Sequence, residues 1–327
     1  MNDKTNKSAI NLVMLIKIKF LSYILAFKPL GWLTGIAFML LGEWFSSHNF
    51  PLFSSIYALL GSACIAFFSS LINNLYDKQL DIFSRKPSII IFRYISSKEM
   101  IFTAVLLLII GLFLLWYVNI YVFIVGLSIT ILSVLYSAPP VRLKIRPPFD
   151  SVVNSLLLAP LPFFLGWTIT GEMLTLSSIL YAFIFFLFIM AYVLVYTSYD
   201  IKTDERFGIV TSCTKLGLKW SVAVATFIFI LSLILSVIYF KLNSQFTISI
   251  LIGSPFFLVI LKKDAKNSSK FVFASHMLWM IILTVFLFTS TRSLFPLTLI
   301  ILIFLWAFYV SIIFPRYIYP QIGYHKN

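Results

Sequence analysis

Ten runs of apolar residues dominate this chain, each close to the length of about 20 residues that an α-helix needs to cross a bilayer. The chain is 61% hydrophobic and 11% charged, whereas about a quarter of the residues in a soluble domain are charged. The runs lie at residues 29–46, 52–73, 100–117, 119–137, 151–169, 174–198, 219–240, 245–262, 271–290 and 294–314. We therefore predict an all-α polytopic membrane protein, a single membrane-embedded domain over residues 1–327 in which nine or ten transmembrane helices surround a central cavity.

The positive charges of the chain predict how it is oriented. A net charge of +14 is also typical of nucleic-acid-binding proteins, but here the charges lie in short loops between apolar runs. With the N-terminus in the cytoplasm, only Lys241 and Arg292 of the 25 Lys and Arg residues fall on the outer side. The expected partner is thus a lipid bilayer and not nucleic acid. Residues 1–28 are expected to form a basic cytoplasmic or interfacial segment of a protein of the cell's inner membrane.

A first group of polar residues lies at the inner end of the second run. Asn73, Asp77 and Asp81 follow one another at four-residue spacing, so on a helix they form one stripe about 12 Å long. Their oxygens are the ligands that Mg²⁺ prefers, and Arg85 and Lys86 follow about one turn later. Taken alone, such a motif is more often a solvated helix end than a functional site.

A second motif of the same type changes that balance. Asp200 and Asp204 repeat the spacing at the inner end of the sixth run, and the predicted topology places both motifs on the cytoplasmic face. If the two helix ends face each other, their carboxylates can hold Mg²⁺ around a diphosphate.

A third feature is the segment 136–144, which joins the fourth and fifth runs. Its two adjacent prolines stop the fourth helix and favour an extended turn, on which Arg142 and Lys144 can point to one side. These two cations are explained equally well as topology signals or as a phosphate-binding pair. Asp150 is expected to cap the fifth helix, and Asn154, one turn further, to face the cavity.

The remaining polar residues are weaker signals. Glu43 near the outer end of the first run and Glu172 in an outer loop are expected to be solvated. The three His residues lack metal-ligand spacing, and the two Cys residues suggest no disulfide framework.

The three features in this order resemble the UbiA-type intramembrane prenyltransferase superfamily. The resemblance is carried by Asn73, Asp77 and Asp81, by segment 136–144, which is similar to the family's YSxPPxRLK sequence, and by the motif 200–204. The chain departs from many members at Asn74, where they have Asp, and from aromatic-acceptor members at Tyr196, where they have Lys. Residues 146–154 are more similar to the branch that includes lycopene elongases and carotenoid prenyltransferases.

The resemblance implies Mg²⁺-dependent transfer of an isoprenyl group from a polyprenyl diphosphate to a lipophilic acceptor, either an aromatic quinone precursor or a polyene such as a carotenoid. It implies catalytic carboxylates, metal ligands, diphosphate-binding cations and residues that line the acceptor site or cavity. The implied catalytic carboxylates are Asp77, Asp81, Asp200 and Asp204, and the implied metal ligands are the same four with Asn73. The implied diphosphate-binding cations are Arg85, Lys86, Arg142, Lys144 and Lys202. The residues implied to line the acceptor site or cavity are Tyr136, Asn154 and Tyr196.

Three alternatives remain open. A phosphoribosyltransferase or a terpene cyclase on the same scaffold would use a similar diphosphate site. A membrane transporter would use the carboxylates as an ion site, but transporters place such groups near the bilayer midplane, whereas all four Asp residues here lie at the predicted ends of spans.

Overall fold

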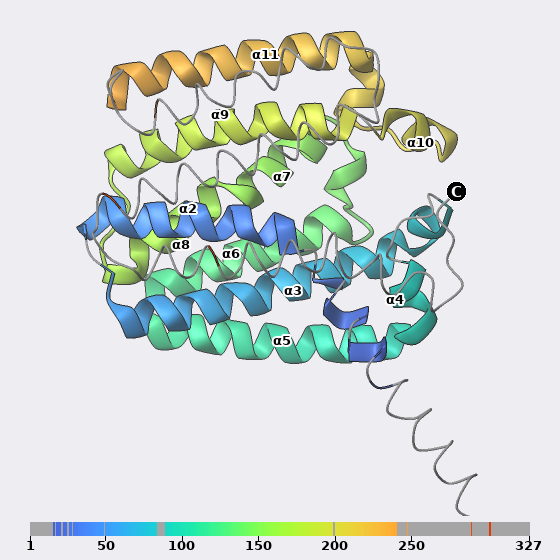
Figure 1. The fold of residues 1–327 in the computed structure, drawn as a ribbon, viewed down its shortest axis with the longest axis horizontal. Helices are drawn as coiled ribbons and strands as arrows, with labels where there is room; N and C mark the ends of the chain where they lie inside the picture. The colour runs from blue at the N-terminus through green and yellow to red at the C-terminus, as the bar shows by residue number, and fades with distance from the viewer. Residues whose placement is uncertain are drawn as a thin grey trace, which may run out of the picture.

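A computed structural model describes residues 16–48 (without 17, 21, 25 and 28), 50–83, 89–198 and 200–240, and the single positions 247, 289 and 301. All regular structure in these residues is helical (Figure 1). The helices are α2 (Pro29–Ser47), α3 (Leu52–Phe83), α4 (Ile89–Tyr94), α5 (Ser97–Val118), α6 (Ile120–Ser137), the 3₁₀ turn η1 (Leu143–Ile145), α7 (Phe149–Leu158), α8 (Pro160–Trp167), the 3₁₀ turn η2 (Thr168–Thr170), α9 (Leu176–Ser198), α10 (Ile201–Arg206) and α11 (Ser212–Phe240).

Six segments of the described residues are long and apolar enough to cross a membrane. They are Leu52–Ile82, Ser97–Val118, Ile120–Ser137, Phe149–Thr170, Leu176–Ser198 and Ser212–Phe240. The prediction of an all-helical membrane protein is confirmed. The predicted number of nine or ten spans is not confirmed. The predicted runs from residue 245 onward lie outside the described helices, and the first run forms α2, which is not among the six candidate spans.

Side-chain caps explain two of the helix boundaries. Ser96 starts α5 with a capping box, in which its hydroxyl accepts from the Glu99 N–H and the Glu99 carboxylate accepts from the Ser96 N–H. Asn119 separates α5 from α6: its side-chain oxygen accepts from the Val122 N–H at 2.9 Å, and its amide donates to the Thr168 carbonyl at 2.8 Å. Asn119 thereby ties the turn between α5 and α6 to the end of the fifth predicted span.

The fifth span is broken, although the sequence predicts one helix over 151–169. The backbone leaves the helical region at Ala159 (φ −130°, ψ −68°), and Pro160, which has no N–H, starts α8. Helix α8 packs closely against α2, since a Cβ on Gly166 would overlap the Met39 carbonyl oxygen. The break therefore directs α8 onto α2.

The long helices pack side by side as a bundle, with α3 against α5, α9 against α11 and α2 against α8 (Figure 1). The core lies where α2, α8 and α9 meet, and Phe38, Phe163 and Phe185 are fully buried there. The ring centroid of Phe185 is 5.2 Å from that of Phe38 and 5.1 Å from that of Phe163. The short helices α4 and α10 and the last turns of α3 lie at one end of the bundle (Figure 1). This end carries both acidic motifs.

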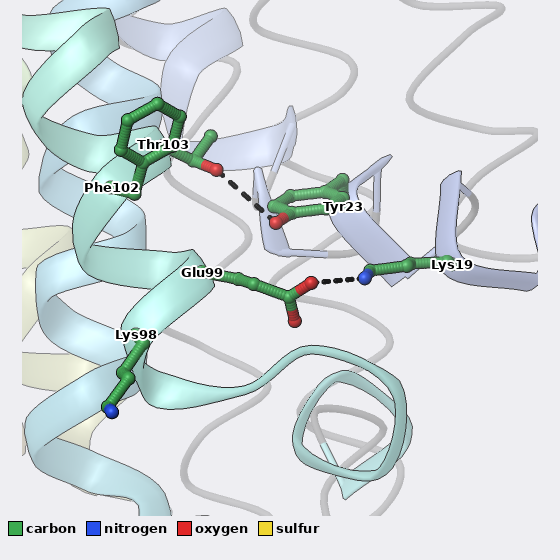
Figure 2. A pocket seen from close by; sticks show the side chains of 6 residues that line it. All are labelled: Lys19, Tyr23, Lys98, Glu99, Phe102 and Thr103. Atoms are coloured by element: carbon green, nitrogen blue, oxygen red, sulfur yellow. Dashed lines mark hydrogen bonds and ion pairs between the residues drawn. The ribbon is translucent and has the colours of Figure 1, made fainter.

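The N-terminal segment lies against the start of α5. Figure 2 shows that Lys19 pairs with Glu99 and that the hydroxyls of Tyr23 and Thr103 are 3.2 Å apart. These contacts border a surface cavity of about 460 Å³ that Lys98 and Phe102 also line. Lys19 and Tyr23 of the basic segment therefore contact the first turns of α5.

One polar residue is buried against expectation. Glu43 is fully buried in α2 and accepts a hydrogen bond from the Ser55 hydroxyl of α3, so the prediction that it is solvated is wrong. The reason is that α8 and η2 pack against α2 and that Ser55 of α3 lies beside the carboxylate. Glu172, in contrast, is exposed as predicted.

Candidate active site

Asp77 is the centre of the polar contacts near the C-terminal end of α3. Its side chain is 9% exposed and accepts from three groups: the Asn73 amide at 3.0 Å, the Arg142 guanidinium at 3.4 Å, and the Lys144 ammonium. Two of these donors are cations from the loop between α6 and α7. The structure therefore brings the first acidic motif and the predicted cationic loop together.

The first motif forms one face of α3, as its spacing predicts. Asp77 and Asp81 are 7% and 4% exposed and Asn73 is half-buried, whereas Lys78 and Gln79 between them are exposed. The charge of Asp81 also acts on Lys144. The stripe thus turns inward, which a solvated helix end would not do.

The loop conformation aims the two cations at Asp77. Arg142 has a left-handed backbone (φ 44°, ψ 60°), rare for a residue with a Cβ, and its N–H donates to the Ala138 carbonyl at 2.9 Å. Its guanidinium also donates to the Tyr76 carbonyl at 3.4 Å, and its buried Nε has no hydrogen-bond partner among the described residues. Burial lowers the pKa of the Lys144 ammonium, and the charge of Asp77 opposes that shift.

The second motif lies on the short helix α10. Asp204 is 8% exposed, and Asp200, half-buried, precedes the helix without capping it through its side chain. The Asp204 carbonyl accepts from the Ile209 N–H at 2.9 Å, which folds the following loop back over α10. The motif therefore belongs to a compact turn between α9 and α11, and not to the sixth span itself.

Tyr136, at the end of α6, lies near residues of both acidic motifs. It lies within electrostatic range of three carboxylates, those of Asp77, Asp150 and Asp204. These residues come from α3, α7 and α10. Tyr136 therefore lies near one residue of each acidic motif, Asp77 and Asp204.

Other predicted site residues are less closely placed. Lys202 is exposed on α10, Tyr196 is 63% exposed on α9, and Asn154 is half-buried on α7. Within the described part of the chain, no hydrogen bond or ion pair joins Lys202 or Asn154 to Asp77. Arg85 and Lys86 lie outside the described residues.

Asp150 is a residue whose surroundings the sequence did not indicate. It was expected to cap the fifth helix, but it lies within the first turn of α7, and its carboxylate accepts from the N–H and hydroxyl of Ser212 in α11. Ser212 is 62 residues away along the chain, so no local sequence pattern predicts the contact.

The donor set fits Mg²⁺ held jointly with a diphosphate. Within the described part of the chain, no three His, Cys, Asp or Glu side chains form a metal site by themselves. Mg²⁺, however, usually takes one or two carboxylates together with substrate phosphates. Asp77 and Asp81 supply such carboxylates, and the unpaired Nε of Arg142 and the ammonium of Lys144 are suited to phosphate oxygens.

Similar proteins share this fold. A UbiA homologue from Archaeoglobus fulgidus bound to GPP and Mg²⁺ is 20% identical with a TM-score of 0.64, over 83% of this chain and 100% of that one. A digeranylgeranylglyceryl phosphate synthase gives 20% identity and 0.64, over 84% and 99% of the two chains. An apo UbiA homologue from Aeropyrum pernix K1 gives 18% and 0.61, over 79% and 95%. No curated protein sequence matches the chain significantly.

The sequence itself decides the family. The model of the UbiA prenyltransferase family matches residues 31–281, which include both acidic motifs and the loop that carries Arg142 and Lys144. This confirms the resemblance drawn from the three motifs. The chain belongs to the UbiA prenyltransferase family.

Proposed function

We propose that this protein transfers an isoprenyl group from a prenyl diphosphate to a lipophilic acceptor in a Mg²⁺-dependent reaction. The observation that carries the proposal is the buried cluster at the end of α3, where Arg142 and Lys144 converge on Asp77. The cluster combines oxygen ligands for a metal with cations for a phosphate. The A. fulgidus homologues bound to GPP and to DMAPP, each with Mg²⁺, support this class of donor.

The residues divide into two groups in this proposal. Asn73, Asp77, Asp81, Asp200 and Asp204 would hold Mg²⁺, which when bound neutralises charge on the departing diphosphate. Lys144 and Arg142 would bind diphosphate oxygens, exchanging their contact with Asp77 for one with the substrate. Arg85, Lys86 and Lys202 remain candidates for the same role.

The chain's own groups favour ionisation of the donor. The allylic C–O bond breaks with its electron pair going to the diphosphate oxygen, and Lys144 and Arg142 stabilise the negative charge that develops there. The resulting allylic cation forms a bond to a carbon of the acceptor, which then loses a proton. Tyr136, close to the carboxylates at the end of α6, is suited to line the path between donor and acceptor.

The acceptor and the orientation belong to the proposal as well. An aromatic quinone precursor and a polyene such as a carotenoid are the two acceptor classes, with Asn154 and Tyr196 as further candidate lining residues. The predicted bias of Lys and Arg toward one side of the membrane supports an active site that faces the cytoplasm, in a protein of the cell's inner membrane.

Product analysis tests the proposal. Membranes containing the protein are incubated with labelled dimethylallyl, geranyl, farnesyl or geranylgeranyl diphosphate and Mg²⁺, with and without a lipid extract. The expected result is a lipid-soluble product that EDTA abolishes and whose mass identifies the acceptor. Release of diphosphate with a cyclic hydrocarbon alone would indicate a cyclase instead, and absence of turnover with every donor would contradict the proposal.

A further inference from the structure

The carboxylate of Asp150 is buried and fully engaged in hydrogen bonds. It is 4% exposed and accepts from three donors: the Ser212 N–H at 2.9 Å, the Ser212 hydroxyl at 2.5 Å and the Ser151 hydroxyl at 3.1 Å. Two of these bonds cross from α7 to α11. A buried charge of this kind is stable because several donors replace the water it has lost.

The Asp150–Ser212 contact joins the two chain segments that carry the site. Asp150 comes at the end of the loop that holds Arg142 and Lys144, which in turn contact Asp77. Ser212 begins α11, directly after the turn that contains Asp204. The contact therefore connects the cationic loop and the first motif on one side with the second motif on the other.

The start of α11 is set apart from the helices on either side of it. The helix is broken at Gly217 (φ 71°, ψ 165°), so its first turn is not a rigid continuation of the long helix that follows. On the other side, the short helix α10 joins this turn through residues 207–211. Cys213 of this turn contacts the Leu194 carbonyl of α9 at 3.1 Å, and the Asp150 carboxylate adds an attachment from α7 on the other side of the turn. The two attachments together determine where the chain that follows the second motif lies.

Asp150 is close to the site but not free to bind a metal. Its charge acts on Tyr136 and on Cys213 together with that of Asp204, so the two carboxylates share one neighbourhood. Its oxygens, however, already accept three hydrogen bonds, and both point toward serine donors. These hydrogen bonds distinguish the role of Asp150 from that of the proposed metal ligands in the two acidic motifs.

We propose that Asp150 is a positioning residue for the diphosphate–metal site: through Ser212 it holds the Asp204 segment at the distance from Asp77 that a shared metal–diphosphate complex requires. This inference rests on the proposed function, since it assigns a role within that same site. It predicts that loss of the contact weakens metal binding without removing a ligand.

The test compares four variants with the wild type. Asp150→Asn removes the charge and one of the two acceptor oxygens, Ser212→Ala removes the hydroxyl donor, and the double variant combines both changes. Ser232→Ala is the matched control, because Ser232 is a fully buried serine of the same helix whose hydroxyl donates to the Ile184 carbonyl of α9 at 3.1 Å, away from the site. The readouts are the Mg²⁺ concentration for half-maximal turnover, Mn²⁺ binding measured by electron paramagnetic resonance with inorganic pyrophosphate present, and the thermal unfolding temperature.

We expect Asp150→Asn and Ser212→Ala each to raise the half-saturating Mg²⁺ concentration and the Mn²⁺ dissociation constant about five- to tenfold, the scale of one lost buried hydrogen bond. The double variant should do no worse than the more affected single variant, since both act through one contact. The number of bound Mn²⁺ ions should stay unchanged. Ser232→Ala should lower the unfolding temperature while leaving both metal affinities at the wild-type value.

Two results would overturn the inference. Metal affinities of Asp150→Asn and Ser212→Ala equal to those of Ser232→Ala would show that the contact only stabilises the fold. Loss of a bound Mn²⁺ in Asp150→Asn, with Ser212→Ala unaffected, would make Asp150 a ligand. If Asp150→Asn does not fold, Ser212→Ala alone decides. A wild type that turns over no donor would refute the proposed function, while the Mn²⁺ titration with pyrophosphate would still decide the role of Asp150.

Discussion

Lys144 donates a hydrogen bond to a carboxylate oxygen of Asp77, although the two residues are 67 positions apart in the chain. Their side chains are only 11% and 9% exposed. A carboxylate this deeply buried is strongly destabilising unless an opposite charge accompanies it. Lys144 therefore serves as an internal counter-ion for the residue that the proposed mechanism assigns to Mg²⁺.

Replacing Lys144 by Met should have opposite effects on donor and metal. Without the ammonium, the KM for the prenyl diphosphate should rise about tenfold, the effect of losing one charge-assisted hydrogen bond. Mn²⁺ should bind more tightly than in the wild type when no donor is present, because Asp77 loses its competing cation. Initial rates and electron paramagnetic resonance titrations measure the two effects. Lys215→Met, at an exposed position of α11, is the control, and an unchanged KM in Lys144→Met would contradict the assignment.

Asp77→Asn should remove turnover while leaving the protein folded. The amide keeps the shape of the side chain but loses the charge that both a metal and Lys144 require, so kcat/KM should fall at least about a hundredfold. The assay is Mg²⁺-dependent product formation, with size-exclusion chromatography in detergent as the check on folding. Gln79→Ala changes an exposed residue of the same helix and should stay fully active. Substantial activity of Asp77→Asn would argue against a metal-binding role.

The adjacent acids of α10 offer a matched pair. Asp204 is 8% exposed and lies near Tyr136, whereas its neighbour Glu205 is exposed. Asp204→Asn should lower kcat/KM by at least about tenfold, and Glu205→Gln should change it less than about twofold. Steady-state kinetics at saturating Mg²⁺ compare the two. Equal effects of the two substitutions would mean that α10 contributes only negative charge.

Close packing between α2 and α8 predicts a stability difference between two glycines. A methyl group on Gly166 would overlap the Met39 carbonyl oxygen, whereas one on Gly35 would lie 3.6 Å from Pro162 Cγ, an ordinary contact. Gly166→Ala should therefore destabilise the protein by about 1–3 kcal/mol, and Gly35→Ala should be tolerated. Thermal unfolding in detergent distinguishes them. Similar unfolding temperatures for the two variants would show that the helices can move apart at little cost.

Patterns within single segments predicted much of the fold. The length and apolarity of the runs up to residue 240 identified the helices, and the four-residue spacing of Asn73, Asp77 and Asp81 identified a stripe of which Asp77 and Asp81 are buried in the structure. These properties depend only on neighbouring residues, so one sequence contains them. The break at Ala159 and the burial of Glu43 were not predicted, because each depends on which helix packs against it.

The sequence by itself determined that this is a helical membrane protein and that its two acidic motifs and one cationic loop resemble those of the UbiA prenyltransferases. Only the tertiary structure decided that Lys144 contacts Asp77 and that Asp150 contacts Ser212. The pattern of residues 136–150 is compatible with topology signals and a helix cap as well as with these contacts. Helix packing decides between these interpretations. Burial removes water from the carboxylates of Asp77 and Asp150, so each must accept hydrogen bonds from donors of another chain segment.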